Sequence, residues 1–169
     1  AALHYVKENQ LQALHHIRSI ARIEEKEHLW LDRFTIKNLE LVYPQHERAK
    51  TLLDVIDYTL TAMGGRLLKR WLLLPLTNLN QIHARNGAVA WFHSNEQACE
   101  SIREHLASCG DLERLISKVA VGKVNPREIR HIHRSLELID PIKQRLNEGK
   151  ENTMICELSN SFQACSELL

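Results

Sequence analysis

Histidine and cysteine are the side chains in this chain that could bind a metal or act as nucleophiles. The sequence contains ten histidines and four cysteines. The pairs His15-His16 and His131-x-His133 lack the four-residue spacing that places two ligands on one helix face. No C-x-x-C motif occurs. We therefore predict no metal site, and we interpret the cysteines (positions 99, 109, 156 and 165) as reduced, mostly buried thiols of an intracellular protein.

Motifs for nucleophilic catalysis or phosphate binding are also missing. A thiol nucleophile at Cys99, with His93 or His105 as its base, would need a third group to orient the base, and the sequence marks none. The phosphate-binding pattern G-x-x-x-x-G-K-[ST] is absent, as are G-x-G-x-x-G and G-x-S-x-G. The sequence thus predicts no catalytic residue and no cofactor site in this chain.

One group of basic side chains has a spacing that could contact phosphates. Arg127, Arg130, His131 and Arg134 recur at i, i+3, i+4 and i+7, which places them on one face of a helix. No aromatic residues that could stack on bases are interleaved with them. A solvated helix face accounts for the same pattern, and at this stage it is the interpretation we favour.

The segment from Thr61 to Leu76 contains the most informative motif, T-x-M-G-x-R-x-L-x-x-W-L-x-x-P-L. We interpret Gly64-Gly65 as a turn that leads into a short helix. Pro75 should end that helix, because proline lacks an N–H and restricts the residue before it. Arg66 belongs to the polar face of the helix, and the predicted apolar face consists of Leu67, Leu68, Trp71 and Leu72.

Helix caps and breakers predict a mainly α, multi-helical, bundle-like fold. Expected helices cover about 3–17, 32–41, 51–57, 78–92, 95–109, 111–122, 125–139, 140–146 and 153 to the end. At most a small β-hairpin is expected near residues 18–32. The predicted buried stripes include Leu79, Ile82 and Val89 in one helix, Leu112, Leu115, Ile116 and Val119 in a second, and Ile129, Ile132, Leu136 and Ile139 in a third.

Size and composition are those of one globular domain. The 169 residues are 44% hydrophobic and 25% charged, with a formal net charge of +1. A charge this small means that any contact with nucleic acid would need a local basic patch. The longest uncharged stretch, residues 71–82, is too short to span a membrane and contains Pro75. Both ends look cut, so we expect a piece of a longer polypeptide.

The motif at 61–76 resembles the core, or lever, domain of the MutS family of DNA mismatch-repair ATPases. Three further segments strengthen this resemblance. Residues 5–17 look like the helix that joins the connector domain to the core, and 31–41 resemble a strand followed by the N-L-E helix. Gly110-Asp111-Leu112-Glu113-Arg114 and Asn125-Pro126-x-Glu128-Ile129 match the G-D-L-E-R and x-P-x-[DE]-[IL] elements.

The resemblance implies one helical domain over residues 1–169, with the connector junction at 1–17 and a DNA clamp inserted after 169. The ATPase and mismatch-reading modules would lie outside this chain, which makes it non-catalytic. ATP and Mg²⁺, mismatched duplex DNA, a second MutS subunit and a MutL-type protein would be ligands or partners of the intact protein. No membrane is involved, and the expected location is the bacterial cytoplasm, in association with the nucleoid.

Two other functions stay open at the level of sequence. An autonomous helical scaffold that binds protein partners would explain the packing pattern without any link to DNA repair. A small helical enzyme with a histidine or cysteine site would require a polar pocket around a reactive side chain. Gly64, Arg66, Trp71 and Pro75 are expected to be structural residues under the lever interpretation.

Overall fold

The computed structural model describes His4 and residues 27–163. The predicted helix at 3–17, the first arm of the predicted hairpin and the chain beyond 163 lie outside the described residues. Within them the fold is helical, as predicted, and the only β-type pairing is an isolated antiparallel bridge between His28 and Leu76. None of the described helices combines the length and apolar character that crossing a membrane would require.

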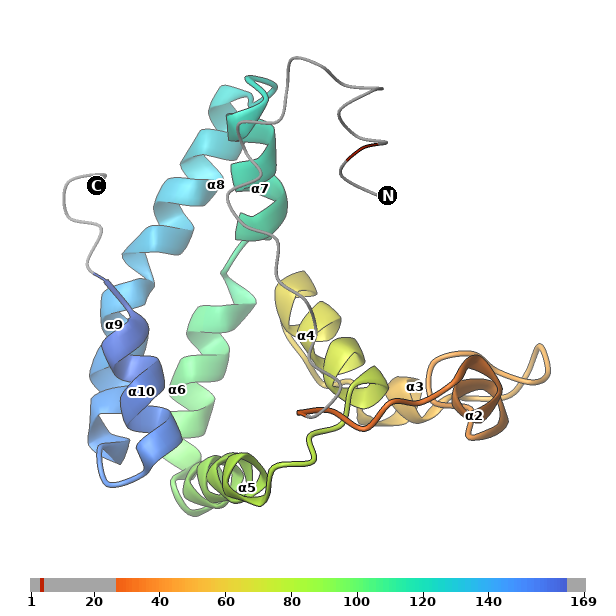
Figure 1. Cartoon of the computed structure of the whole chain (residues 1–169). Helices are drawn as coiled ribbons and strands as arrows, with labels where there is room; N and C mark the ends of the chain where they lie inside the picture. Colours follow the sequence, from red (N-terminus) through yellow and green to blue (C-terminus); the bar gives the residue numbers. More distant parts are fainter. Residues whose placement is uncertain (1–3, 5–26, 164–169) are drawn as a thin grey trace.

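Three short helices form the first part of the described chain. They are α2 (Arg33–Asn38), α3 (Leu52–Ile56) and α4 (Ala62–Leu73). The Asp32 side chain caps α2 by accepting a hydrogen bond from the Thr35 N–H at 2.6 Å. Thr51 caps α3 in a reciprocal arrangement with Asp54. We call residues 27–78 the α2–α4 unit, which lies on the right in Figure 1.

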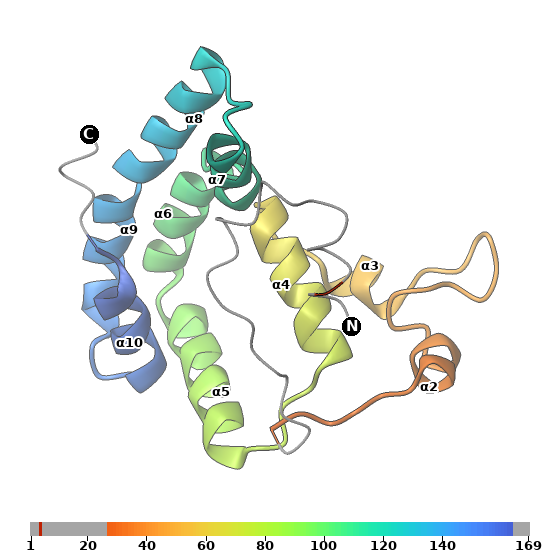
Figure 2. The same cartoon turned by 45° about the horizontal axis from the view of Figure 1, so that its top comes forward.

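The remaining helices form a larger assembly, which we call the α5–α10 body (residues 79–163). Its elements are α5 (Leu79–Ser94), α6 (Glu96–Ala107), α7 (Leu112–Ala120), α8 (Pro126–Glu137), α9 (Ile139–Leu146), the 3₁₀ turn η1 (Asn147–Gly149) and α10 (Thr153–Ser161). In Figure 1 and Figure 2, α8 and α9 follow each other end to end along one side, with α7 and α6 beside them. α10 packs against α5 and α9, and α7 packs against α8.

The predicted helix boundaries in this body are confirmed where a cap or breaker defines them. Asn78 caps α5 by accepting hydrogen bonds from two backbone N–H groups. Asn125 and Glu128 form a reciprocal capping box at the start of α8, and Pro126 is the first helical residue. Gly122, with φ of +66°, follows the end of α7, in the left-handed conformation that glycine adopts at low cost.

The hydrophobic core belongs to the α5–α10 body. Ala88, Ile102, Ile142, Leu146 and Ile155 form one buried cluster, and Ile155 has no exposed surface. Trp91 and Phe92 pack against it from α5, with their rings in an edge-to-face arrangement 5.0 Å apart. Glycine is needed at position 149, because a Cβ there would lie 2.8 Å from the Trp91 ring.

The predicted turn at Gly64-Gly65 is wrong. Both glycines lie inside the first turns of α4, which begins at Ala62 and is capped by Thr61. Neither has a positive φ. Glycine matters there because the preceding loop approaches the helix closely: a Cβ at Gly64 would lie 3.3 Å from the Thr59 Cβ.

Several predicted core faces are also wrong in part. Leu67, on the expected apolar face of α4, is 47% exposed, whereas Leu68, Trp71 and Leu72 are half-buried. The buried stripes predicted for three other helices are also wrong in part, because some of their side chains are exposed. These are Leu79, Val89, Ile116, Val119 and Ile129. Amphipathic spacing identifies a helix, but it does not determine whether another segment covers the apolar face.

Candidate functional site

Groups suited to metal or nucleophile chemistry are scattered in the part of the chain that the structure describes. No cluster of three or more histidine, cysteine or acidic side chains there could hold a metal ion. Cys99, Cys109 and Cys156 are free thiols of intermediate burial. Cys99 and His93 line a shallow pocket with Phe92, but no hydrogen bond joins them within the described residues. The geometry provides no reactive centre.

The most organised polar arrangement surrounds Arg66, on the exposed side of α4. Its guanidinium donates two parallel hydrogen bonds to Asp111, at 2.9 Å and 2.7 Å. It also donates to Glu113 Oε2, from Nε at 3.0 Å and from Nη2 at 2.5 Å. This planar fork on two carboxylates is a geometry that lysine cannot reproduce. It joins two motifs that lie 45 residues apart in the sequence.

The electrostatics of this contact follow from its hydrogen bonds. Those from Arg66 to Asp111, and then to Glu113, raise the pKa of the arginine above its ordinary value. The same contact lowers the pKa of the Asp111 carboxyl, and the Arg114 backbone N–H reinforces that shift. The Asp111 carboxylate is therefore held in its charged form. Arg66 and Glu113 remain substantially exposed, so solvent screens the pair.

Asp111 has a second role at the start of α7. Its Oδ1 accepts a hydrogen bond from the Arg114 N–H at 3.3 Å and so caps the helix. The preceding Gly110 N–H donates to the Ser135 hydroxyl of α8 at 2.9 Å, and that hydroxyl donates to the His131 carbonyl at 2.8 Å. Ser135 is 2% exposed. The Gly110-Asp111 corner is therefore hydrogen-bonded to α4 on one side and to α8 on the other.

A second arginine makes a contact near the other end of α4. The Arg85 guanidinium of α5 lies 3.7 Å from the centre of the Trp71 ring, a cation–π geometry. Pro75 ends α4 as predicted, and its carbonyl accepts a hydrogen bond from the Leu29 N–H at 2.8 Å. Arg66 and Arg85 thus connect the α2–α4 unit to the α5–α10 body at two separate points.

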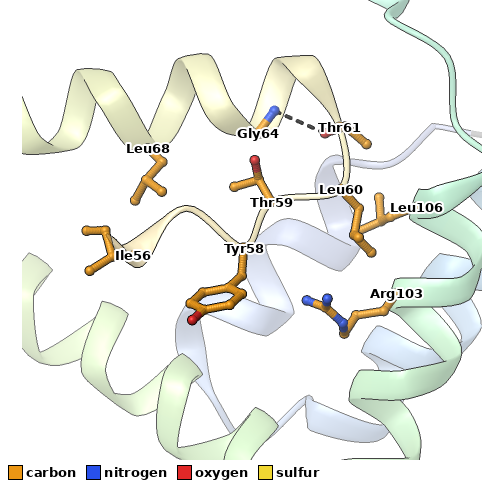
Figure 3. Close-up of a pocket in the computed structure, with 9 residues that line it drawn as sticks. All are labelled: Ile56, Tyr58, Thr59, Leu60, Thr61, Gly64, Leu68, Arg103 and Leu106. Carbon is orange, nitrogen blue, oxygen red and sulfur yellow. Dashed lines mark hydrogen bonds between the residues drawn. The ribbon is translucent and has the colours of Figure 1, made fainter. Parts of the chain in front are cut away.

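Between α4 and α6 the structure leaves a pocket of about 390 Å³. Figure 3 shows Arg103, from α6, extending its guanidinium into this space toward the loop before α4, which carries Tyr58. The same view shows the hydrogen bond from the Gly64 N–H to Thr61, which fixes the start of α4. The α2–α4 unit and the α5–α10 body are incompletely packed at this pocket. The contacts of Arg66 and Arg85 with their partners therefore contribute to holding the two in position.

Comparison with known proteins identifies the family to which this arrangement belongs. A family model described as MutS domain III matches residues 34–168. The DNA mismatch repair protein MutS of Flavobacterium psychrophilum is 49% identical over 169 residues, which is 99% of this chain and 19% of that protein. The proteins of the same name from Flavobacterium johnsoniae and Bacteroides thetaiotaomicron are 46% and 41% identical. This chain belongs to the MutS family. It spans about a fifth of the length of these relatives.

Within MutS domain III, residues from motifs that we interpreted separately in the sequence contact each other in the structure. Arg66, predicted only as part of a polar helix face, binds the acidic residues of the G-D-L-E element. Arg85 and Ser135 were not predicted from the sequence to be functional residues. Ser135 had one usable signal: it is a small polar residue placed directly before Leu136 of the predicted apolar stripe.

The basic residues predicted as a group lie together on α8. Arg127, Arg130, His131 and Arg134 are all exposed, on the face opposite Ile132 and Leu136. The hydrogen bonds that lead from the Arg66 contact reach α8 through Ser135 and the His131 carbonyl, and not through any of these basic side chains. They therefore form a second candidate site of this MutS domain, with a different chemistry.

Proposed function

We propose that this chain is the core, or lever, part of a MutS protein and mechanically links mismatched-DNA binding to the ATPase of the intact protein. The observation that carries the proposal is the Arg66 fork on Asp111 and Glu113. A displacement of α4 would pass through that fork to α7, and from Gly110 through Ser135 to α8. Such a path transmits motion without any catalytic group.

The proposal also assigns roles to parts of the protein beyond this chain. A connector module would precede residues 1–17, and a DNA clamp would follow residue 169. ATP and Mg²⁺ would bind in the ATPase module, so this chain would be non-catalytic. Mismatched duplex DNA, a second MutS subunit and a MutL-type protein would be partners of the whole protein, in the bacterial cytoplasm at the nucleoid. The exposed apolar residues of α7 and α8 support contact with further segments.

A variant that removes the fork but keeps the helix tests the proposal. In the full-length protein that contains this domain, we expect Arg66→Gln to leave basal ATP hydrolysis and mismatch binding largely intact. The effect of each ligand on the other should weaken several-fold, because coupling between two sites is reciprocal. Mismatch-dependent ATPase rates and nucleotide-dependent DNA affinity would measure the two directions.

Matched variants separate coupling from folding. Arg70→Gln removes a charge from the same helix at an exposed position with no ion pair among the described residues, and it should leave coupling unchanged. Arg66→Lys keeps the charge but loses the fork, so it should resemble Arg66→Gln. Thermal melts would show that each variant is folded. Unchanged coupling in a folded Arg66→Gln protein would refute the assigned path.

A further inference from the structure

The basic face of α8 presents charge that nothing in the described structure neutralises. Arg127, Arg130 and Arg134 are exposed and make no ion pair within residues 27–163. A helix rises about 1.5 Å per residue, so the outer two arginines are separated by roughly 10 Å along its axis. One strand of B-DNA carries about three phosphate charges over that distance.

The neighbouring carboxylates are already engaged elsewhere. Glu128 accepts hydrogen bonds from Lys118 of α7 and from the Asn125 N–H of its own cap. Glu137 lies 3.6 Å from His133 Nδ1, one turn beyond Arg134 along α8. Neither carboxylate forms an ion pair with Arg127, Arg130 or Arg134 within the described residues, which leaves the arginines available to an external anion.

Arg134 lies in the last turn of α8, where a cation stabilises the helix, but helix stability does not account for Arg127. Arg127 is in the first turn of α8, where the partial positive charge of the helix terminus disfavours a cation. The same position is favourable for binding an anion, because the helix terminus and the guanidinium attract it together. Arginine forks match phosphate oxygens, and no aromatic side chain lies on this face to stack on bases.

We propose that the basic face of α8 binds the sugar–phosphate backbone of duplex DNA, without reading its sequence. The net charge of the whole chain is only +1, so attraction to DNA depends on this local concentration of charge. The inference does not depend on the coupling path through Arg66, which reaches α8 through Ser135 and not through the three arginines.

Two charge-matched triple variants of the 169-residue chain test this interface. Arg127→Gln/Arg130→Gln/Arg134→Gln removes the basic face. Arg33→Gln/Arg48→Gln/Arg70→Gln removes three exposed arginines from the α2–α4 unit and leaves the same net charge. Affinity for a fluorescent duplex would be measured by anisotropy over a range of salt concentrations. We expect the first variant to bind about tenfold more weakly and to reduce the slope of log K against log[salt] by about two to three.

The control triple should retain most of the affinity and slope of the unmodified chain. Equal losses in both triples would overturn the proposal, because they would show attraction by total charge alone. Preferential binding of a poly-glutamate peptide over duplex DNA through these arginines would also overturn it and would indicate an acidic protein partner. Mismatched and matched duplexes should bind equally, since the contact is with the backbone.

A second measurement keeps the test valid if the triple variant fails to fold. A photo-crosslinking residue placed at Arg130 should form adducts with duplex DNA, whereas the same residue at Lys69 of α4 should not. Circular dichroism would confirm that both labelled proteins are helical. Equal crosslinking at the two positions, or none at Arg130, would contradict the proposal.

Discussion

The α2–α4 unit and the α5–α10 body are both helical, but they are stabilised in different ways. The body contains the buried cluster of Ala88, Ile102, Ile142, Leu146 and Ile155. In the described part of the α2–α4 unit, Leu41 is the only buried apolar side chain, and Trp30, Phe34 and Tyr58 are each at least 70% exposed. The body is held together by apolar packing. The unit depends on helix caps and on the arginine contacts at the two ends of α4.

Under the proposed lever role, this difference would divide the domain into a rigid part and a part that can be displaced. Moving helices within a buried core costs apolar contacts throughout it. Moving the α2–α4 unit would instead strain the Arg66 and Arg85 contacts, which join α4 to α7 and to α5. A domain proposed to transmit motion would use the second kind of connection at its movable joint.

The largest effect is expected from Ile155→Ala in the body. Ile155 has no exposed surface, and truncating a fully buried isoleucine typically destabilises a protein by about 2–5 kcal/mol. We expect a loss of about 3 kcal/mol in urea unfolding. The matched change Ile56→Ala in α3, where the side chain is 38% exposed, should cost less than about 1 kcal/mol. Equal losses at the two sites would show that the unit shares the stability of the core.

Adding one methyl group at Gly149 tests how tightly the body is packed. The new Cβ would lie 2.8 Å from the Trp91 ring and 2.9 Å from Ile155 Cγ2. We expect Gly149→Ala to cost about 2 kcal/mol, because overpacking a filled core forces its neighbours to move. Urea melts would measure the loss, and Trp91 fluorescence would report the local change. A neutral result would show that the core can yield at this point.

The Trp71 contact should be weaker than a buried aromatic contact, because the ring is only half-buried. We expect Trp71→Ala to cost about 2 kcal/mol, compared with the roughly 3–5 kcal/mol of an aromatic side chain in a core. Combining it with Arg85→Ala in a double-mutant cycle should reveal a coupling of about 0.5–1 kcal/mol. Strict additivity would show that the arginine covers the ring without stabilising it.

The smallest effect concerns pH and the Arg66 fork. Because the fork lowers the pKa of Asp111 in the folded state, its stabilisation is present above the unfolded pKa of about 3.9 and is lost as pH falls through the lower folded value. Asp111→Asn keeps a good cap residue but removes the charge. Urea midpoints of the two proteins should therefore differ at pH 7 and converge below about pH 4. A difference that grows on acidification would contradict this assignment.

Sequence alone was sufficient for the features set by neighbouring residues. Asp32, Thr51, Asn78, Asp111 and Asn125 start helices as predicted, because a cap acts on N–H groups only two or three residues away. Pro75 ends α4 for an equally local reason. The ordered motifs also indicated the family that the comparisons then established.

Tertiary structure decided what depends on distant neighbours. Spacing placed Ile116 and Ile129 on apolar faces, but whether another segment buries those faces is not encoded in the helix itself. The glycines at 64 and 65 could be interpreted as a turn until the close approach of the Thr59 loop was visible. The partner of Arg66 lies 45 residues away, and only the folded chain brings the guanidinium to the Asp111 carboxylate.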